Sequence, residues 1–361
     1  MKKQIAITLF FFMSFVMLCA QNSDSKTQKL KNAFQSESFQ LLGYGQLQYN
    51  INEYPERALS PGKANNSIDI TRAILFATGK LGANNQYGYM LMFDFGPNAQ
   101  LLELYGEWLP SKSLNVRFGQ FKTPYTIENP ISPSRIETVN FSRPAAAMSG
   151  SVGDFNQWEP DGKAVVKAGR DAGLQLYGLL FPSNGFFRLE YYAGLFNGTG
   201  MNRKDNNNHK DFIGTIYAYP VKEFKLGGSI YLGKLPTYLK DQGRLPGENF
   251  DINRWTIGAE YKGTRLCGRT EYLASNDGGL KRNGYYGLLL WKYIPNKWEM
   301  IGKYDYYNLN TQIKDNEIRD FTFGINYYFA YLSRIQLNYI YTDNKIGGNN
   351  HALAAQLQVF F

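Results

Sequence analysis

The chain ends with HALAAQLQVFF, residues 351–361, in which apolar and polar positions alternate. Gln356 and Gln358 fall on one face of an extended chain, and the opposite face carries Leu353, Ala355, Leu357, Val359 and Phe361. Alternation of period two is typical of a strand with one apolar face. Because backbone groups without partners are costly in an apolar medium, such a terminal strand needs a neighbour on both sides. The stretch therefore predicts a sheet that closes on itself.

The partner that closes the sheet is predicted at the other end of the chain. FQLLGYGQLQYNI, residues 39–51, alternates in the same way, with Leu41, Leu47 and Tyr49 on one face and Gln46 and Gln48 on the other. Pairing the last strand with this first one removes both free edges.

The alternation continues between these two ends. Short connections, such as PSKS at 110–113 and PNKW at 295–298, alternate along the chain with longer polar ones. This pattern is typical of an outer-membrane barrel. The fold class predicted is all-β, a transmembrane antiparallel barrel of 16 strands: 39–51, 67–81, 86–96, 100–109, 114–122, 172–181, 185–196, 211–219, 224–234, 251–262, 265–275, 282–293, 298–309, 318–329, 333–343 and 351–361.

The composition fits this class and excludes others. Charged residues make up 19% and aromatic residues 16%, and mean hydropathy is −0.39. The body of the chain has no apolar run of 18 residues, which excludes spanning helices. Trp255, Trp291, Trp298 and Tyr304 are interpreted as membrane girdles.

The N-terminus predicts export. Residues 1–20 carry Lys2, Lys3, an apolar stretch and Ala20 before a cleavage point, as in a secretory signal peptide. A lipid anchor on Cys19 is the alternative, but Leu18 is large for that motif. Residues 21–38 are interpreted as a polar periplasmic spacer and 39–361 as the barrel. Export makes nucleic acid an unexpected partner despite the basic pI of about 9.2, and Cys267 would have no intramolecular disulfide partner.

One long connection is expected to fold inward. Residues 162–169, GKAVVKAG, could form another strand, but a seventeenth strand would give the odd count that bacterial barrels avoid. Residues 123–171 therefore leave and return on the outer side as the third external loop. A loop of this length is usually functional, and in a wide barrel it can narrow the pore.

Four stretches resemble the phosphate-selective porin O and P family. They are LNVRFGQFKTPYTIENPIS at 114–132, RDAGLQLYG at 170–178, YYAGLFNGTG at 191–200 and DITRAILFATGKL at 69–81. The resemblance implies a sixteen-stranded, commonly trimeric outer-membrane porin that passes anions. The residues of this sequence that match the family's motifs by position are Arg72, Arg117, Gln120, Lys122 and 196–198. The family's second strand is richer in arginine than this one, which argues against strong phosphate selectivity.

Charge alone does not decide the selectivity of the pore. Alternation assigns nine bases to the lumen: Arg117, Arg188, Lys225, Arg254, Lys262, Arg265, Arg269, Lys303 and Arg334. It also assigns nine acids: Asp94, Glu103, Glu107, Glu190, Glu260, Glu271, Glu299, Asp305 and Asp320. Anion selectivity would therefore need bases clustered at a constriction.

The residues expected to bind anions are Arg72, Arg117, Lys122, Arg135, Arg143, Arg265 and Arg269. A turn at Gly263–Thr264 would pair Lys262 with Arg265 and form a basic stripe with Arg269. Ion pairing of wall bases with wall acids is the alternative to a dedicated anion site. Arg117 could pair with Glu103 or Glu107, and Lys122 falls on the lipid-facing side by strict alternation.

The function expected is passive diffusion of small hydrophilic solutes across the bacterial outer membrane, with a preference for phosphate-like anions. The alternatives are a non-selective porin and a sealed structural or adhesin barrel. The two histidines, His209 and His351, lie in no catalytic motif, and residues 204–211 lack the spacing of a calcium loop, so no catalytic site, metal or cofactor is predicted. Expected partners are outer-membrane lipid, small anions, the barrel-assembly machinery through Phe361, and two further copies in a homotrimer.

Overall fold

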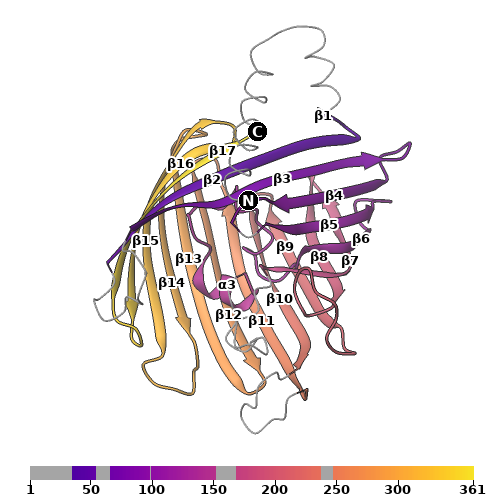
Figure 1. Ribbon diagram of the computed structural model, residues 1–361. Coiled ribbons are helices and arrows are strands. Elements are labelled where there is room, and N and C mark those ends of the chain that lie inside the picture. Colours follow the sequence, from indigo (N-terminus) through magenta and orange to yellow (C-terminus); the bar gives the residue numbers. More distant parts are fainter. Residues whose placement is uncertain (1–34, 54–65, 98, 152–167, 237–246) are drawn as a thin grey trace.

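The computed structural model describes residues 35–53, 66–97, 99–151, 168–236 and 247–361. These residues form a closed barrel of antiparallel strands, shown in Figure 1. The sixteen barrel strands, all of which the alternation predicted, are β2 (Phe39–Glu53), β3 (Asn66–Leu81), β4 (Tyr87–Asp94), β5 (Gln100–Trp108), β6 (Asn115–Lys122), β7 (Arg170–Ser183), β8 (Phe186–Phe196), β9 (Asp211–Val221), β10 (Phe224–Pro236), β11 (Asn249–Lys262), β12 (Leu266–Asp277), β13 (Leu280–Ile294), β14 (Trp298–Asn308), β15 (Glu317–Ala330), β16 (Ser333–Asn344) and β17 (Asn350–Phe360).

The barrel closes where the first and last strands meet. β17 pairs with β2 in antiparallel register, with Leu357 opposite Leu47 and Gln356 opposite Gln48. Phe361 extends the seam, because its N–H donates to the carbonyl of Gly43 (2.9 Å) and its carbonyl accepts from the N–H of Gly43 (2.8 Å). The pairing predicted between the two ends of the chain is confirmed.

The two faces of the wall have opposite polarity. On β17, Leu353 and Leu357 are exposed, while Gln356 and Gln358 are buried inside the barrel. The same pattern runs round the wall, so the apolar side chains point outward toward the position of the membrane. Among the described residues, no helix is long and apolar enough to cross a membrane.

Both described ends of the chain lie at one end of the barrel, together with the short turns (Figure 1). These turns include 184–185, 222–223 and 331–332. The strand ends that flank the longer connections, Lys122 of β6 and Arg170 of β7 among them, lie at the opposite end, and 278–279 is a short turn there. By the usual orientation of such barrels, the end with the termini is periplasmic.

β2 begins at Phe39, the expected first residue of the barrel, but the expected end of the long loop is wrong. Part of the polar N-terminal spacer forms β1 (Gln35–Ser36), which folds back on Phe39 and Gln40 of β2. The long loop ends at residue 169 rather than 171, because Arg170 and Asp171 already pair with Lys122 and Phe121 of β6. The signal peptide at 1–20 and most of the optional strand at 162–169 lie outside the described residues.

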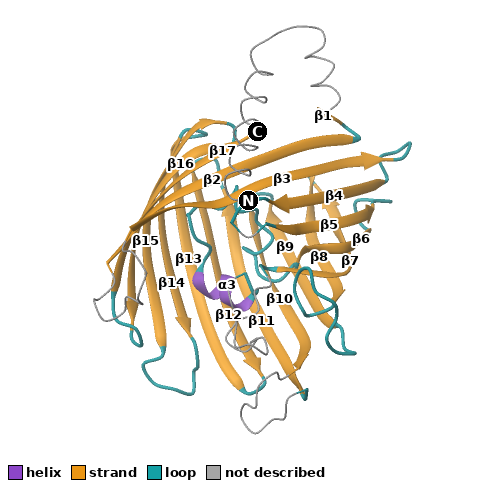
Figure 2. Ribbon diagram, viewed as in Figure 1, coloured by secondary structure: helices purple, strands orange, loops and turns teal. Residues whose placement is uncertain are grey.

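The long connection between β6 and β7, residues 123–169, is called loop L3 below. Its described part, residues 123–151 and 168–169, contains the one helix of the described residues, α3 (Arg143–Met148). Figure 2 shows α3 in front of the strands around β12 and β13, and the helix contacts β12, β13 and β14.

Candidate functional site

The main chain of L3 is held by polar side chains that point inward from the barrel wall. These side chains replace the hydrogen bonds that the irregular backbone would otherwise make to water. In eight bonds a wall side chain donates to a backbone carbonyl oxygen of the loop. The pairs, donor first, are Thr215 and Pro124, Gln46 and Pro133, Gln358 and Ser134, Arg334 and Ile136, Gln336 and Glu137, Asn326 and Glu137, Lys303 and Asn140, and Arg254 and Met148. Glu271 accepts from the N–H of Ile127, and Asn338 from the N–H of Val139.

One side of L3 packs into an apolar core inside the barrel. Tyr125 and the α3 residues Ala145, Ala147 and Met148 belong to a buried cluster with wall residues from β8 to β14: Phe196, Ile213, Tyr231, Ile252, Leu273, Tyr286 and Tyr307. This cluster fills the interior beside those strands, so the open volume lies on the other side of the loop.

A buried ion network joins L3 to β11 and β12. The guanidinium of Arg269 forms ion pairs with Glu137 and Glu128 of the loop and, at 3.6 Å, with Glu260 of β11. Arg269 is 3% exposed and Glu128 is fully buried. Arg269 therefore bonds the loop to the wall and has its charge compensated by three carboxylates.

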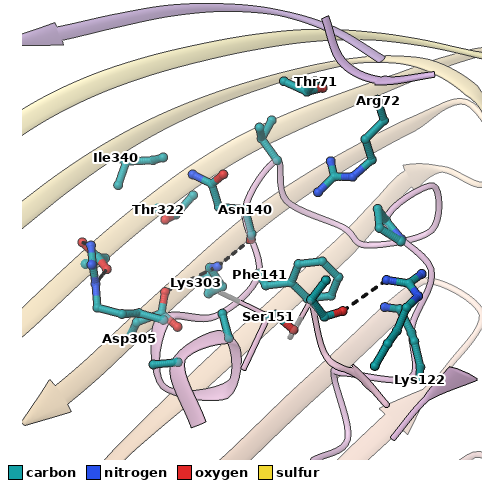
Figure 3. Close-up of a pocket in the computed structure, with 18 of the residues that line it drawn as sticks. Thr71, Arg72, Lys122, Asn140, Phe141, Ser151, Lys303, Asp305, Thr322 and Ile340 are labelled. Carbon is teal, nitrogen blue, oxygen red and sulfur yellow. Dashed lines mark hydrogen bonds and ion pairs between the residues drawn. The ribbon is translucent and has the colours of Figure 1, made fainter. Parts of the chain in front are cut away.

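A cavity of about 630 Å³ lies between L3 and the wall formed by β14–β16 and β2–β7 (Figure 3). Its charged lining residues are Arg72, Lys122, Arg143, Arg170, Lys303, Asp94, Asp305 and Asp320. Its apolar lining includes Ile74, Leu102, Val139, Phe141 and Ile340. The cavity thus combines ionic and apolar surfaces within one part of the lumen.

Three of the cavity's bases have a carboxylate partner. Arg143 donates to Asp320 at 2.9 Å, Arg170 donates to Glu103 at 3.0 Å, and Lys303 lies 3.4 Å from Asp305. Burial alone would lower the pKa of Arg143 in the loop, but its hydrogen bond to Asp320 raises that pKa above its usual value. These pairs largely cancel their own charges.

Arg72 and Lys122 are the two cavity bases that form no ion pair with any described residue. Arg72 Nη1 donates to the neutral amide oxygen of Gln46 at 2.8 Å. Lys122 Nζ donates to two backbone carbonyls of L3, those of Asn129 and Ile131, at 2.7 Å each. Figure 3 shows both side chains at the same cavity. Within the described residues, neither charge is compensated by an ion pair, and both side chains line the cavity.

A bulge in β3 turns Arg72 inward. Arg72 pairs with Gln46 while Ile70 pairs with Leu47, so Thr71 is the extra residue. Ile68 and Ile70 before the bulge are exposed on the lipid side, whereas Ile74 after it is 2% exposed in the interior. One extra residue reverses the faces of a strand, which is how bulges redirect side chains.

The remaining predicted anion-binding residues lie elsewhere. Arg117 faces inward but pairs with Glu107 at 2.7 Å and stacks on Tyr105. Arg135 is exposed and bonds to the hydroxyl of Tyr331 in the β15–β16 turn, near the periplasmic end. Arg265 is exposed in the turn before β12. Of the seven predicted residues, the structure brings Arg72, Lys122 and Arg143 to the cavity.

The register predicted for the β11–β12 hairpin is wrong. Lys262 pairs with Cys267 rather than Arg265, and Glu260 lies opposite Arg269. A three-residue connection, 263–265, replaces the expected two-residue turn. The basic stripe of Lys262, Arg265 and Arg269 is therefore not formed, and Glu260 neutralises both Lys262 and Arg269.

Comparison with known proteins supports a porin. Residues 223–361 match the family described as phosphate-selective porin O and P, whereas the stretches that carry the resemblance in the sequence lie before residue 223. No curated protein matches the chain.

Solved structures share the fold at low sequence identity. An anion-selective porin from Comamonas acidovorans is 14% identical with a TM-score of 0.65, and the match covers 90% of this chain and 99% of that one. The outer membrane channel DcaP of Acinetobacter baumannii is 12% identical, with a TM-score of 0.57 and coverage of 90% and 99%. OmpT of Vibrio cholerae, in a trimer form, is 11% identical, with a TM-score of 0.58 and coverage of 89% and 100%. The chain therefore has the fold of bacterial outer-membrane porins, and its residues 223–361 match the phosphate-selective porin O and P family.

Proposed function

We propose that this porin prefers anions and that Arg72 and Lys122 set the preference. The observation that carries the proposal is that these two bases line the cavity with neutral partners, while the other cavity bases face carboxylates. The family match and the Comamonas porin, which is described as anion-selective, support the same preference.

The distance of each base from the solute affects ion selectivity more than the total charge of the lumen does. Two unit charges about 4 Å apart interact by roughly 4 kcal/mol at an effective dielectric constant of about 20. At physiological salt, charges farther than roughly 8 Å from the solute are largely screened. Arg117, Arg135 and Arg265, which do not line the cavity, therefore contribute less than Arg72 and Lys122.

The test is the reversal potential of the purified channel in a planar bilayer under a KCl gradient. We expect anion preference for the natural chain and a shift toward cations in the double variant Arg72→Gln, Lys122→Gln. Arg265→Gln, which removes an exposed base outside the cavity, is the control and should leave the potential unchanged. A natural channel that prefers cations, or a double variant identical to it, would refute the proposal.

Weak selectivity is the second candidate, and one observation favours it. Asp94, Asp305 and Asp320 line the same cavity as the bases. Asp305 and Asp320 already pair with Lys303 and Arg143, so Asp94 is the carboxylate that could offset Arg72 and Lys122. If it does, the reversal potential lies near zero and the porin is a general diffusion channel. A barrel that conducts no ions would instead be a sealed structural protein.

We also propose that the porin is a homotrimer and that Phe361 is presented to the assembly machinery. The trimer form of the Vibrio porin supports the first point. The terminal position of Phe361 at the closing seam, with a 43% exposed side chain, supports the second. Native mass spectrometry in detergent would give the number of copies.

A further inference from the structure

We propose that the cavity beside L3 selects organic carboxylates that carry an apolar body, and that it binds them more tightly than inorganic phosphate. This inference rests on the proposed anion preference and adds the class of anion. Three features of the described residues support it: the arrangement of the bases, the nature of the remaining lining, and the cavity volume.

The bases suit one compact anionic group. The guanidinium of Arg72 is held by Gln46 at 2.8 Å through one nitrogen, so its other donors are available to a ligand. Lys122 uses two of its three protons on the carbonyls of Asn129 and Ile131. An ammonium and a planar guanidinium together provide the few donors that a carboxylate needs.

The same arrangement is poorly suited to phosphate. Phosphate is strongly hydrated and partly divalent at neutral pH, so it needs many donors to replace the water it loses. The cavity supplies two bases that have no carboxylate partner among the described residues, and it also exposes the phosphate to the nearby carboxylate of Asp94. Asp94 Oδ1 accepts from the backbone N–H groups of Ala73 and Gly96, which hold this carboxylate in place.

The lining next to the bases is apolar. Phe141 of L3 places its ring centroid 5.1 Å from Lys122 Nζ. Ile74 and Leu102 of the wall, Val139 of the loop and Ile340 of β16 also line the cavity, and Ile340 is the one of these four that is not buried. A hydrated inorganic ion gains nothing from such a surface, whereas an organic anion removes its apolar part from water there.

The volume also fits a small organic molecule. The cavity measures about 630 Å³, and small-molecule sites are commonly about 300–1,000 Å³. A carboxylate bonded to Lys122 would place its apolar body against Phe141, because ring and ammonium are neighbours.

The experiment measures block of the chloride current through single reconstituted channels in about 0.15 M KCl, where screening acts over roughly 8 Å. The probes are benzoate, acetate and inorganic phosphate. We expect benzoate to reach half-block at a concentration about tenfold lower than either other anion, a difference that corresponds to ~1.4 kcal/mol.

Two variants separate the apolar lining from the charges. Ile340→Asn makes the wall polar without changing L3, and Phe141→Leu keeps an apolar side chain but removes the ring. Both should raise the half-blocking concentration of benzoate severalfold and leave that of acetate unchanged. Heat-dependent electrophoretic mobility, which distinguishes folded from unfolded barrels, checks that each variant folds.

Each outcome decides between the two proposals. If the natural channel prefers anions and phosphate blocks better than benzoate, or if Ile340→Asn leaves benzoate block unchanged, the inference about organic carboxylates is wrong and the anion preference stands. If the KCl reversal potential shows cation preference, the anion preference itself fails. Benzoate block that is strong in the natural chain and weak in Ile340→Asn supports the inference.

Discussion

Gly284 of β13 lies directly beneath Pro144 of helix α3. A Cβ atom at position 284 would come 2.6 Å from the Cβ of Pro144 and 2.6 Å from the carbonyl oxygen of Tyr306. The absence of a side chain on the wall therefore makes room for the first turn of the helix. Gly258 of β11 has the same role for Ile127, whose Cδ1 would lie 2.9 Å from an added Cβ. The wall therefore holds L3 by hydrogen bonds and also has glycines at positions where the loop packs closely against it.

Gly284→Ala should displace α3 away from β13, toward the cavity. The added methyl group has to move Pro144, and such overpacking costs typically about 1–3 kcal/mol. We expect a changed single-channel conductance with more current noise. Gly287→Ala, on the same strand but with no atom within 4 Å of the added Cβ, is the matched control and should behave as the natural chain.

Arg269→Gln should loosen L3. The change leaves Glu128, Glu137 and Glu260 without their shared cation, and breaking a buried ion pair in this way costs roughly 3–5 kcal/mol. The released loop should be cut faster by trypsin after Arg135, which is followed by Ile136, and the fragments are measured by mass spectrometry. Arg265→Gln is the control, because Arg265 is exposed in a turn. An unchanged rate of cleavage after Arg135 would show that Arg269 does not hold the loop.

Substitutions in the Arg143–Asp320 pair should shift selectivity in opposite directions. Arg143→Gln leaves the carboxylate of Asp320 facing the cavity and should move the reversal potential toward cations. Asp320→Asn removes the charge opposite Arg143 and should move it toward anions, while the asparagine can still bond to Thr342, which donates to Asp320 at 2.6 Å. Both shifts should shrink at high salt because of screening. Shifts of the same sign in both variants would mean that the pair acts by altering the loop.

The strands and their number followed from the sequence because alternation is a local property. The direction of Arg72 did not, since strict alternation from Ile68 and Ile70 places it on the lipid side. The bulge at Thr71 that reverses it has no local signal in the sequence and becomes visible only in the pairing with Gln46 and Leu47.

The direction of the Lys122 side chain also differs from the one that strict alternation predicts. It falls on the side of Phe118, which is 70% exposed, yet its ammonium bonds to loop carbonyls. Lys122 is the last residue of β6, where the pleat no longer fixes the direction of a long side chain. The assembly of the cavity likewise could not be predicted, because Phe141 and Lys303 lie more than 150 residues apart and meet through the packing of L3.

The last prediction concerns the closing seam. A Cβ atom at Gly43 would come 2.8 Å from the ring of Phe361 and 2.7 Å from the carbonyl oxygen of Ile74, so Gly43→Ala crowds the point where the chain ends meet. We expect a loss of stability of about 1–3 kcal/mol, as is typical of overpacking, seen as a lower urea midpoint for unfolding of the detergent-solubilised barrel. Gly45→Ala, two residues along the same strand and with no atom within 4 Å of its added Cβ, should unfold as the natural chain does. If Gly43→Ala and Gly45→Ala have the same midpoint, contact between Phe361 and Gly43 does not contribute to closing the barrel.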